Sequence, residues 1–246
     1  MILPSKQEVG YGGGPAIGLI VLSTDETLEP EFRQIKTQPA TSLYHSRIAF
    51  EPVVTKATLA RMELALPACV DLFSNHIDFN AIGYGCTSGA TIIGSERIAQ
   101  IINERFPGAA VTDPINAVKA ACEALGVVRL GLLTPYSIEV SSSMQRLLEA
   151  QGIEISGFAT FNETQDHRVA RIAESSILDG MLELGKGDCD AVFASCTSLR
   201  CFNVIEQAEK ILGKPVFSSN SAFAWHLHTL AGISGEIQGP GQLFRY

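Results

Sequence analysis

The sequence predicts an α/β fold made of two pseudo-symmetric, Rossmann-like (flavodoxin-type) lobes, each with a four-stranded parallel sheet and with the active site between the lobes. Three observations lead to this expectation. Short β-rich runs alternate with helical patterns, the alternation repeats once along the chain, and 246 residues suit one large domain or two small lobes. Alternating strands and helices form parallel βαβ units, in which helices cover both faces of the sheet.

Four short apolar runs, rich in β-branched residues, are expected to be buried strands. They cover residues 16–22, 80–84, 129–133 and 190–194. Between these runs, apolar residues recur with helical spacing, which predicts helices. The helical patterns cover residues 90–106, 115–125, 142–151 and 204–212.

An internal repeat divides the chain into two similar halves. From Gly18 to Cys86 is 68 residues, and the matching interval from Gly131 to Cys196 is 65. A helix-capping residue follows each cysteine, Asp113 after 27 residues and Asn220 after 24. Landmarks in the same order at nearly the same spacing indicate two lobes of the same fold, related by a pseudo-twofold axis.

The composition excludes several classes of protein. Hydrophobic residues make up 46% and charged residues 18%, which is typical of a globular chain rather than a disordered one. A net charge of −8 argues against binding to nucleic acid or to an anionic membrane surface. No run approaches the roughly 20 apolar residues that cross a bilayer. The opening segment does not resemble a secretory signal, so we expect a cytoplasmic protein.

The six cysteines show neither CxxC nor CxxH spacing, which argues against zinc, and we expect no metal site. Two of them occur in the same tripeptide, Cys-Thr-Ser, at equivalent positions of the repeat. Each tripeptide is expected to follow a buried strand and to precede a helix, at the sheet edge where ligands bind. There the helix dipole lowers the pKa of a thiol, so Cys86 and Cys196 are candidate catalytic residues.

The residues that follow each cysteine carry hydroxyl groups, which can cap a helix or bind a substrate carboxylate. We therefore expect Thr87, Ser88, Thr197 and Ser198 to bind substrate. Two thiols that face each other suit chemistry at a small planar or prochiral carbon. One thiol acts as base or nucleophile while the other supplies a proton, and no external cofactor is needed.

The doubled Cys-Thr-Ser motif resembles the paired cysteines of the aspartate/glutamate racemase superfamily. Residues 18–31 and the segment Leu132-Leu-Thr-Pro-Tyr136 resemble its maleate isomerase and arylmalonate decarboxylase branch. The resemblance covers roughly residues 16–232. It is most marked with the ectoine-utilisation EutA-like proteins, which share the Leu-Ser-Thr-Asp start, the Leu-Thr-Pro-Tyr segment and the Cys-Thr-Ser-Leu-Arg run.

The resemblance implies roles for individual residues. In maleate isomerases the first cysteine adds to the double bond and the second acts as acid or base, roles that fall on Cys86 and Cys196. A tyrosine that binds substrate matches Tyr136. Two substrate-binding asparagines of the family match Asp25 and His167 in this chain. A carboxylate at Asp25 repels a substrate carboxylate unless it is protonated or paired, so maleate itself is not the expected substrate.

The leading function is therefore a cofactor-independent, two-cysteine isomerase or racemase that acts on a small carboxylate, with a role in ectoine or amino-acid catabolism implied by the resemblance. One alternative is an arylmalonate-type decarboxylase, although that enzyme keeps only the second cysteine. Another is a non-catalytic small-molecule binding protein, to which two nucleophiles bring no advantage. The oligomeric state is left open, a homo-oligomer included.

The resemblance also implies that the last helix packs back on the first lobe. We therefore expect residues 1–113 plus 220–246 to form the N-terminal lobe and residues 114–219 to form the C-terminal lobe. The glycine-rich segment Gly10–Gly14 precedes the first strand instead of following it and lacks a Gly-Lys-Ser/Thr sequence. It is therefore expected to be an N-terminal arm rather than a phosphate-binding loop.

Overall fold

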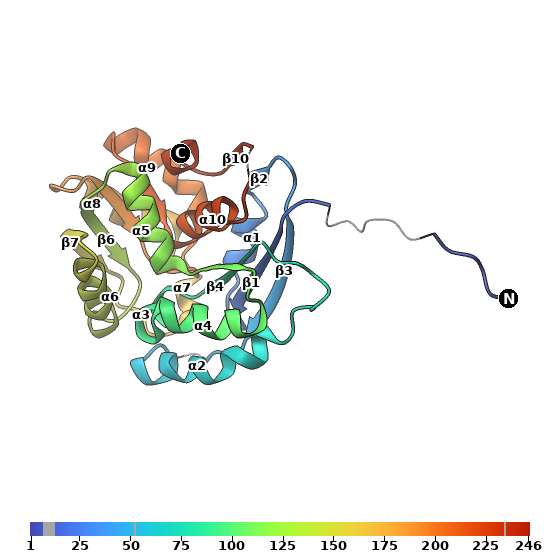
Figure 1. The fold of residues 1–246 in the computed structure, drawn as a ribbon. Helices are drawn as coiled ribbons and strands as arrows, with labels where there is room; N and C mark the ends of the chain where they lie inside the picture. Colours follow the sequence, from blue (N-terminus) through green and yellow to red (C-terminus); the bar gives the residue numbers. More distant parts are fainter. Residues whose placement is uncertain (7–12, 52, 234) are drawn as a thin grey trace.

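The protein contains two parallel sheets of four strands, as shown by a computed structural model that describes residues 1–6, 13–51, 53–233 and 235–246 (Figure 1). In the first sheet the order is β3-β1-β4-β5 and in the second it is β7-β6-β8-β9. In both sheets the first strand along the chain is therefore second in the order, and the second strand lies at the edge beside it. The predicted fold is thereby confirmed. The strands are β1 (Ala16–Leu22), β3 (Ser42–Ile48), β4 (Ala81–Gly85), β5 (Ala110–Thr112), β6 (Arg129–Thr134), β7 (Glu154–Thr160), β8 (Ala191–Ala194) and β9 (Val216–Ser218).

Helices connect the strands and cover the sheets, and a short antiparallel pair of strands lies apart from both sheets (Figure 1). The helices are α1 (Leu28–Phe32), α2 (Lys56–Val70), α3 (Thr87–Ile93), α4 (Ser95–Arg105), α5 (Pro114–Leu125), α6 (Ile138–Ala150), α7 (Asp166–Val169), α8 (Glu174–Gly185), α9 (Phe202–Leu212), α10 (Ser219–Leu230) and the 3-10 helix η1 (Gln242–Arg245). The antiparallel pair is β2 (Lys36–Thr37) with β10 (Ile237–Gln238).

One predicted helix is wrong in its length. The expected single helix over residues 90–106 is two helices, α3 and α4, which meet at Gly94. The φ of Gly94 is 90°, a conformation that is open to glycine and interrupts a helix. Of the expected N-terminal arm, residues 10–12 lie outside the described part of the chain, which includes Gly13 and Gly14.

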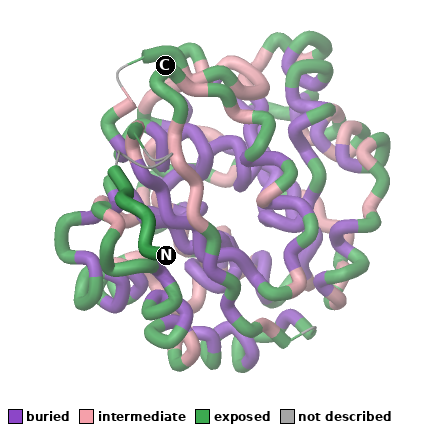
Figure 2. The backbone as a smooth tube through the Cα atoms, turned by 90° about the vertical axis from the view of Figure 1, so that its right-hand side faces the viewer, coloured by how far each residue is buried: buried purple, intermediate pink, exposed green. Residues whose placement is uncertain are grey.

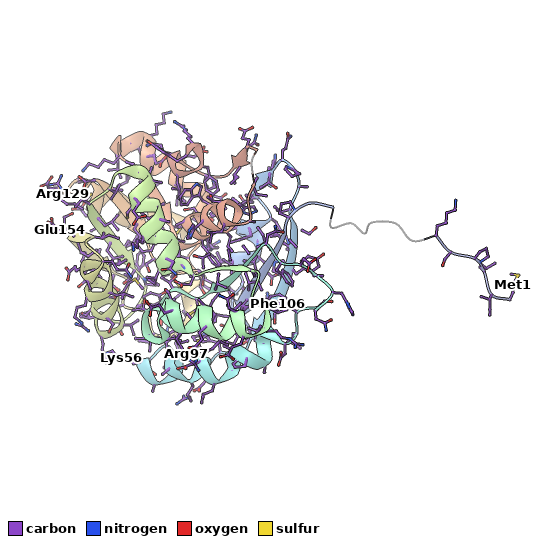
Figure 3. All side chains as sticks on the ribbon, viewed as in Figure 1. Met1, Lys56, Arg97, Phe106, Arg129 and Glu154 are labelled. Atoms are coloured by element: carbon purple, nitrogen blue, oxygen red, sulfur yellow. The ribbon has the colours of Figure 1, made fainter. Side chains whose placement is uncertain are left out.

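The core lies in the two sheets and along the helix faces that pack on them. Every residue of β1, β4 and β8 is buried, and Figure 2 shows the buried backbone gathered at the centre of the molecule. At one end of the first lobe, Phe73, Phe79 and Phe106 pack edge to face or tilted, with ring centroids 5.1–6.2 Å apart. Figure 3 labels Phe106 at this end. Such aromatic clusters bury a large apolar surface.

The C-terminal segment returns from the second sheet to the first lobe. Helix α10 follows β9, yet it packs against α5 and against β4 and β5 (Figure 1). Strand β10 then pairs with β2 of the first lobe. Helices α5 and α10 each follow the last strand of their sheet and pack on one another, as the pseudo-twofold repeat requires. The residue boundaries of the two lobes stay a prediction.

Polar contacts join the lobes near the carboxyl ends of the strands. The Thr24 hydroxyl donates to Asp166 (2.6 Å), and the Thr27 hydroxyl donates to the Ser198 carbonyl (3.0 Å). At the surface, Lys56 of α2 pairs with Glu139 of α6 (3.3 Å), and Figure 3 shows Lys56 at the end of α2. These contacts hold the two lobes closed over the site described below. In the described part of the chain, no helix has both the length and the apolar character to cross a membrane.

Candidate active site

Four loops at the carboxyl ends of central strands meet between the lobes. Asp25 follows β1 and Cys86 follows β4 in the first lobe, while Tyr136 follows β6 and Cys196 follows β8 in the second. The two strands of each lobe are neighbours in their sheet. The chain runs from the first of them to one edge of the sheet and from the second to the opposite edge. Loops diverge at such a switch point, and ligands of open α/β sheets bind in the crevice they leave.

Cys86 is the N-cap of α3, as the sequence predicted. Its sulfur accepts a hydrogen bond from the Gly89 backbone N–H (3.2 Å) and lies 3.7 Å from the Ser88 hydroxyl. Gly89 permits this close turn, because a Cβ atom there would lie 3.0 Å from the Cys86 sulfur and 2.5 Å from the Tyr84 hydroxyl. The Cys86 residue is only 3% exposed.

Cys196 does not lie at a helix N-terminus, which corrects the expectation. Helix α9 begins at Phe202, and the residues between form a turn in which the Ser198 N–H donates to the Cys196 sulfur (3.3 Å). The φ of Cys196 is 140°, a conformation that residues with a side chain rarely adopt. Strain of this kind persists only where the surrounding structure holds it in place, and it is common at functional sites.

Ser219, the first residue of α10, joins the two cysteine loops. Its hydroxyl oxygen accepts from the Thr87 hydroxyl (2.8 Å) and from the Cys196 N–H (2.9 Å). The residue is fully buried. One side chain thus fixes the first loop to the second and holds Cys196 in its strained conformation. Sequence reasoning missed this residue, since it placed the helix cap at Asn220, whereas Ser218 is the cap and Ser221 completes a capping box with it.

Two buried polar atoms near the thiols have no hydrogen-bond partner within the described residues, Asp25 Oδ2 and the Tyr136 hydroxyl; Oδ1 of Asn220, whose amide nitrogen donates to the Thr197 carbonyl, is a third such atom next to the second cysteine loop. The other oxygen of Asp25 accepts from the N–H groups of Thr27 and Leu28, both at 2.7 Å. The Tyr136 hydroxyl is close enough to Cys196 and Cys86 that charge on either thiol raises its pKa. An unpaired buried polar atom costs free energy, so these two atoms are candidates to contact a ligand.

The structure places Asp166 against the second cysteine loop, and not its predicted neighbour His167. The His167 side chain is exposed on α7 and makes no hydrogen bond that reaches the cysteine loops in the described structure. Its neighbour Asp166 is 5% exposed and accepts from Thr24 (2.6 Å) and from the Ser198 hydroxyl (3.1 Å). The carboxylate that faces the second cysteine loop is therefore Asp166, because the first turn of α7 directs this side chain inward and the next one outward.

The expected hydroxyl groups are buried at the site, but three of them bind protein atoms. Thr87 donates to Ser219, Thr197 donates to the Gly85 carbonyl (3.5 Å), and Ser198 donates to Asp166. The Ser88 hydroxyl lies beside the Cys86 sulfur. These residues fix the loops in place, so a role in substrate binding stays a prediction for each of them.

Glu31 of α1 is a further buried carboxylate that the sequence did not indicate. Its Oε1 accepts from the N–H groups of Cys201 (2.7 Å) and Phe202 (3.0 Å), which open α9 in the other lobe. Its Oε2 accepts from Asn220 Nδ2 (2.7 Å), and the same amide nitrogen donates to the Thr197 carbonyl (2.8 Å). Glu31 thus ties the second cysteine loop to the first lobe. Burial raises the pKa of Glu31 to about 7.

The expectation of acidic thiols is wrong for the closed structure. Burial raises the pKa of Cys86 to about 12, and the nearby carboxylates of Asp166 and Asp25 raise it further. The pKa of Cys196 is raised by burial, the largest cause, and by the carboxylates of Asp166 and Asp25, although the nearby Tyr136 hydroxyl opposes the shift. Desolvation outweighs the donors around each sulfur because both thiols are buried and two carboxylates lie close by.

Thiol labelling should reveal these raised pKa values. We expect iodoacetamide to modify Cys86 of the unliganded protein slowly at pH 8, with a rate that keeps rising above pH 9, since the thiolate is the reactive form. Peptide mass spectrometry after timed labelling measures the rate for each cysteine. An inflection below pH 8.5 at either cysteine would show that the thiols are acidic after all.

Comparison with known proteins identifies the family and the fold. A family model described as arylmalonate decarboxylase matches residues 96–244. The maleate isomerase of Nocardia farcinica (strain IFM 10152) is 25% identical over 239 residues, which cover 93% of this chain and 95% of that protein. The arylmalonate decarboxylase of Bordetella bronchiseptica is 29% identical over 140 residues, covering 56% of this chain and 58% of that protein.

Solved structures share the fold of the whole chain. A mutant of the Nocardia farcinica maleate cis-trans isomerase, solved with a covalently bound succinylcysteine intermediate, superposes with a TM-score of 0.84 at 23% identity. The match covers 95% of this chain and 99% of that one. The predicted branch is confirmed, while the special likeness to EutA-like proteins stays a prediction. Because the family model spans more than half of its length, this chain belongs to the arylmalonate decarboxylase family.

Proposed function

We propose that the protein is a cofactor-independent isomerase or racemase that acts on a small carboxylate through Cys86 and Cys196. The observation that carries this proposal is the meeting of two thiols from two lobes at one buried site. Ser219 joins their loops, and the unpaired hydroxyl of Tyr136 lies beside both sulfurs. A relative with the same fold was solved with a succinylcysteine intermediate, which supports a nucleophilic role for a cysteine.

The two thiols perform complementary steps in this proposal. In cis–trans isomerisation, the Cys86 thiolate adds to one carbon of a double bond and the Cys196 thiol protonates the other. Rotation about the new single bond, followed by loss of the same proton and of the sulfur, gives the other isomer. In racemisation, one thiolate removes the α-proton and the opposite thiol returns a proton to the other face. Either path begins with one thiol ionised.

The closed lobes exclude water from this chemistry. Cys86 and Cys196 are 3% and 4% exposed, and the strand-like contact between Val53 and Gln165 crosses from the first lobe to the segment beside Asp166. Substrate therefore enters when the lobes part, and closure then brings the sulfurs to it. Water that reached a carbanion-like intermediate would quench it, so a sealed site favours isomerisation over side reactions.

Decarboxylation is the second candidate, because the family model that matches the chain is that of arylmalonate decarboxylase. The presence of a thiol on both lobes distinguishes the two reactions. Loss of CO₂ leaves a carbanion that needs one proton donor, whereas isomerisation and racemisation use a group on each side of the reacting carbon. Cys86 and Cys196 supply both groups.

An NMR screen of small mono- and dicarboxylates in D₂O tests the function. Racemisation exchanges the α-proton for deuterium, and addition to an alkene interconverts geometric isomers. We expect one of these two signatures. Release of CO₂ would establish a decarboxylase, and binding without any conversion would establish a binding protein and contradict the proposal.

Tyr136→Phe tests the contact of this hydroxyl with substrate. Because the hydroxyl has no protein partner among the described residues, its removal should leave stability nearly unchanged, within about 0.5–1 kcal/mol. Turnover should fall by about 10-fold or more, the effect of losing a hydrogen bond of about 1.4 kcal/mol in the transition state. Steady-state kinetics and thermal unfolding of the same preparation measure both. Unchanged kinetics would remove Tyr136 from the site.

The cellular setting remains part of the proposal. All six cysteines are free and buried, which supports a reducing compartment and hence the cytoplasm. Roles in ectoine or amino-acid catabolism follow from the sequence resemblance alone, and the oligomeric state remains open. The absence of a nucleic-acid partner follows from the net charge of −8.

A further inference from the structure

We propose that the substrate carries a protonated nitrogen as well as its carboxylate, and that Asp25 and Asp166 bind this nitrogen beside the two thiols. The inference rests on the proposed function and specifies its substrate class. A plain dicarboxylate fits this place poorly, because two carboxylates of the protein lie close enough to the thiols for their charge to act on both.

Asp25 presents an oxygen that the described protein atoms leave unsatisfied. Oδ1 receives two backbone N–H groups, while Oδ2 is buried without a partner, in a residue that is 3% exposed. The Thr197 hydroxyl lies close enough to lower the pKa of Asp25, but its hydrogen bond goes to the Gly85 carbonyl. A buried oxygen that lacks a donor, on a carboxylate whose charge reaches both thiols, is suited to accept a hydrogen bond from a ligand.

Asp166 brings a second carboxylate to the same place from the other lobe. It influences the pKa of Asp25, of Cys86 and of Cys196, so all four groups lie within reach of each other's charge. Among the described residues, its two side-chain oxygens accept only from hydroxyl groups, those of Thr24 and Ser198. Neutral donors offset the charge less than an ammonium group does.

The basic side chains near the site bind other groups, and Arg200, four residues past Cys196, donates to the Ile172 carbonyl (3.1 Å). Arg47 donates to the backbone carbonyl of Asp25 (3.2 Å), but its guanidinium pairs with Glu29 at 2.7 Å. Arg168 pairs with Glu163 (3.0 Å) and Arg171 with Glu26 (2.8 Å). Within the described residues, neither Asp25 nor Asp166 takes part in an ion pair. Glu31 and Asp113 are also buried without an ion pair in the described structure, but Asp25 alone of the three keeps a buried oxygen without a donor, and Asp166 adds a second charge nearby, so the missing positively charged donor is assigned to the ligand.

A bound cation also helps the chemistry. The carboxylates of Asp166 and Asp25 raise the pKa of both thiols, which disfavours the thiolate that either reaction needs. A protonated nitrogen between them offsets this repulsion, so the thiolate forms more readily when the correct substrate is bound. A dicarboxylate adds negative charge instead and makes ionisation of the thiol harder. The same electrostatics therefore select the substrate and activate the nucleophile.

Binding of matched ligand pairs tests the inference. The pairs are succinate with β-alanine and glutarate with 4-aminobutanoate, in which an ammonium group replaces one carboxylate. A third pair, 2-hydroxybutanoate with 2-aminobutanoate, compares a neutral group with a charged one. By titration calorimetry or ligand-observed NMR at pH 8, we expect the wild-type protein to prefer each amine-bearing member by about 10-fold or more.

Asp25→Asn should reverse this preference. Asparagine keeps the acceptor for Thr27 and Leu28 but removes the charge, so affinity for the amine-bearing ligands should fall by about 30-fold or more. Affinity for the dicarboxylates should rise. Asp113→Asn is the matched control, since Asp113 is a buried aspartate whose Oδ1 likewise accepts from two helix N–H groups. It should leave the preference unchanged.

The outcomes separate this inference from the proposed function. Wild-type protein that binds the dicarboxylates as tightly as the amines, or that binds no amine-bearing ligand, overturns the inference. It does so even if an isomerase reaction on another carboxylate is found. Amine binding that depends on Asp25 without any turnover in D₂O supports the inference and contradicts the isomerase proposal.

Discussion

Cys86→Ser and Cys196→Ser are each expected to lower turnover by about 10² or more, the low end of the contribution of a general acid or base. A hydroxyl in place of either thiol ionises far less readily and is a weaker nucleophile. Serine occupies nearly the same volume, so both variants should stay folded. Steady-state rates on the carboxylate found by the NMR screen, with circular dichroism of each variant, measure the effect.

The control variants are Cys122→Ser and Cys189→Ser, whose thiols are buried outside the site. Cys122 lies on α5, and the Cys189 thiol donates to the Leu184 carbonyl (3.6 Å). Both variants are expected to keep their activity. If Cys86→Ser or Cys196→Ser retains near-normal turnover, the protein does not use two thiols and the mechanism proposed above is wrong.

Asp25→Asn is expected to stabilise the unliganded protein by about 3 kcal/mol at pH 8. Burial raises the pKa of Asp25 from 3.8 to about 6. Between these two pH values the folded state keeps a proton on Asp25 that the unfolded state has lost. Stability therefore falls as pH rises from about 4 to about 6, and the cost, of order 1.4 kcal/mol for each pKa unit, is complete above pH 6. Asparagine carries no such cost.

Urea unfolding of wild type and variant between pH 5 and pH 8 measures this difference, which should widen with pH. Asp190→Asn should change the stability at pH 8 in the opposite direction. Its pairing with Arg129 lowers the pKa of Asp190 to about 2, so its charge stabilises the protein at pH 8 and that variant should be less stable there. If Asp25→Asn destabilises the protein at pH 8, the charge of Asp25 is satisfied within the protein and needs no ligand.

The sequence predicted the fold, and the position of Cys86 and Cys196 directly after buried strands, because both depend on local patterns. The apolar runs that form β1, β4, β6 and β8 are buried on both faces, so they are continuous in the sequence. Edge strand β7 alternates between exposed and half-buried residues and gives no such run. Asp166 comes shortly after this strand, and without the strand the residue had no predicted place near the thiols.

Other parts of the site depend on contacts between distant segments. Ser219 is one of several small polar residues before a predicted helix, and nothing in that pattern shows that its hydroxyl would meet Thr87 and Cys196. Glu31 caps a helix of the opposite lobe, 170 residues further along the chain. The ionisation of Cys86 depends on complete burial, which a helix-cap position alone does not reveal.

A crystal structure of the Cys86→Ser variant with the carboxylate that the wild-type protein converts is the most direct test of the central claim. We predict that the reacting carbon lies between residue 86 and the Cys196 sulfur, with the Tyr136 hydroxyl and Asp25 Oδ2 in contact with the ligand. A ligand bound elsewhere, for example in the surface pocket of about 420 Å³ between Gln34 and Glu206, would contradict the assignment of the active site.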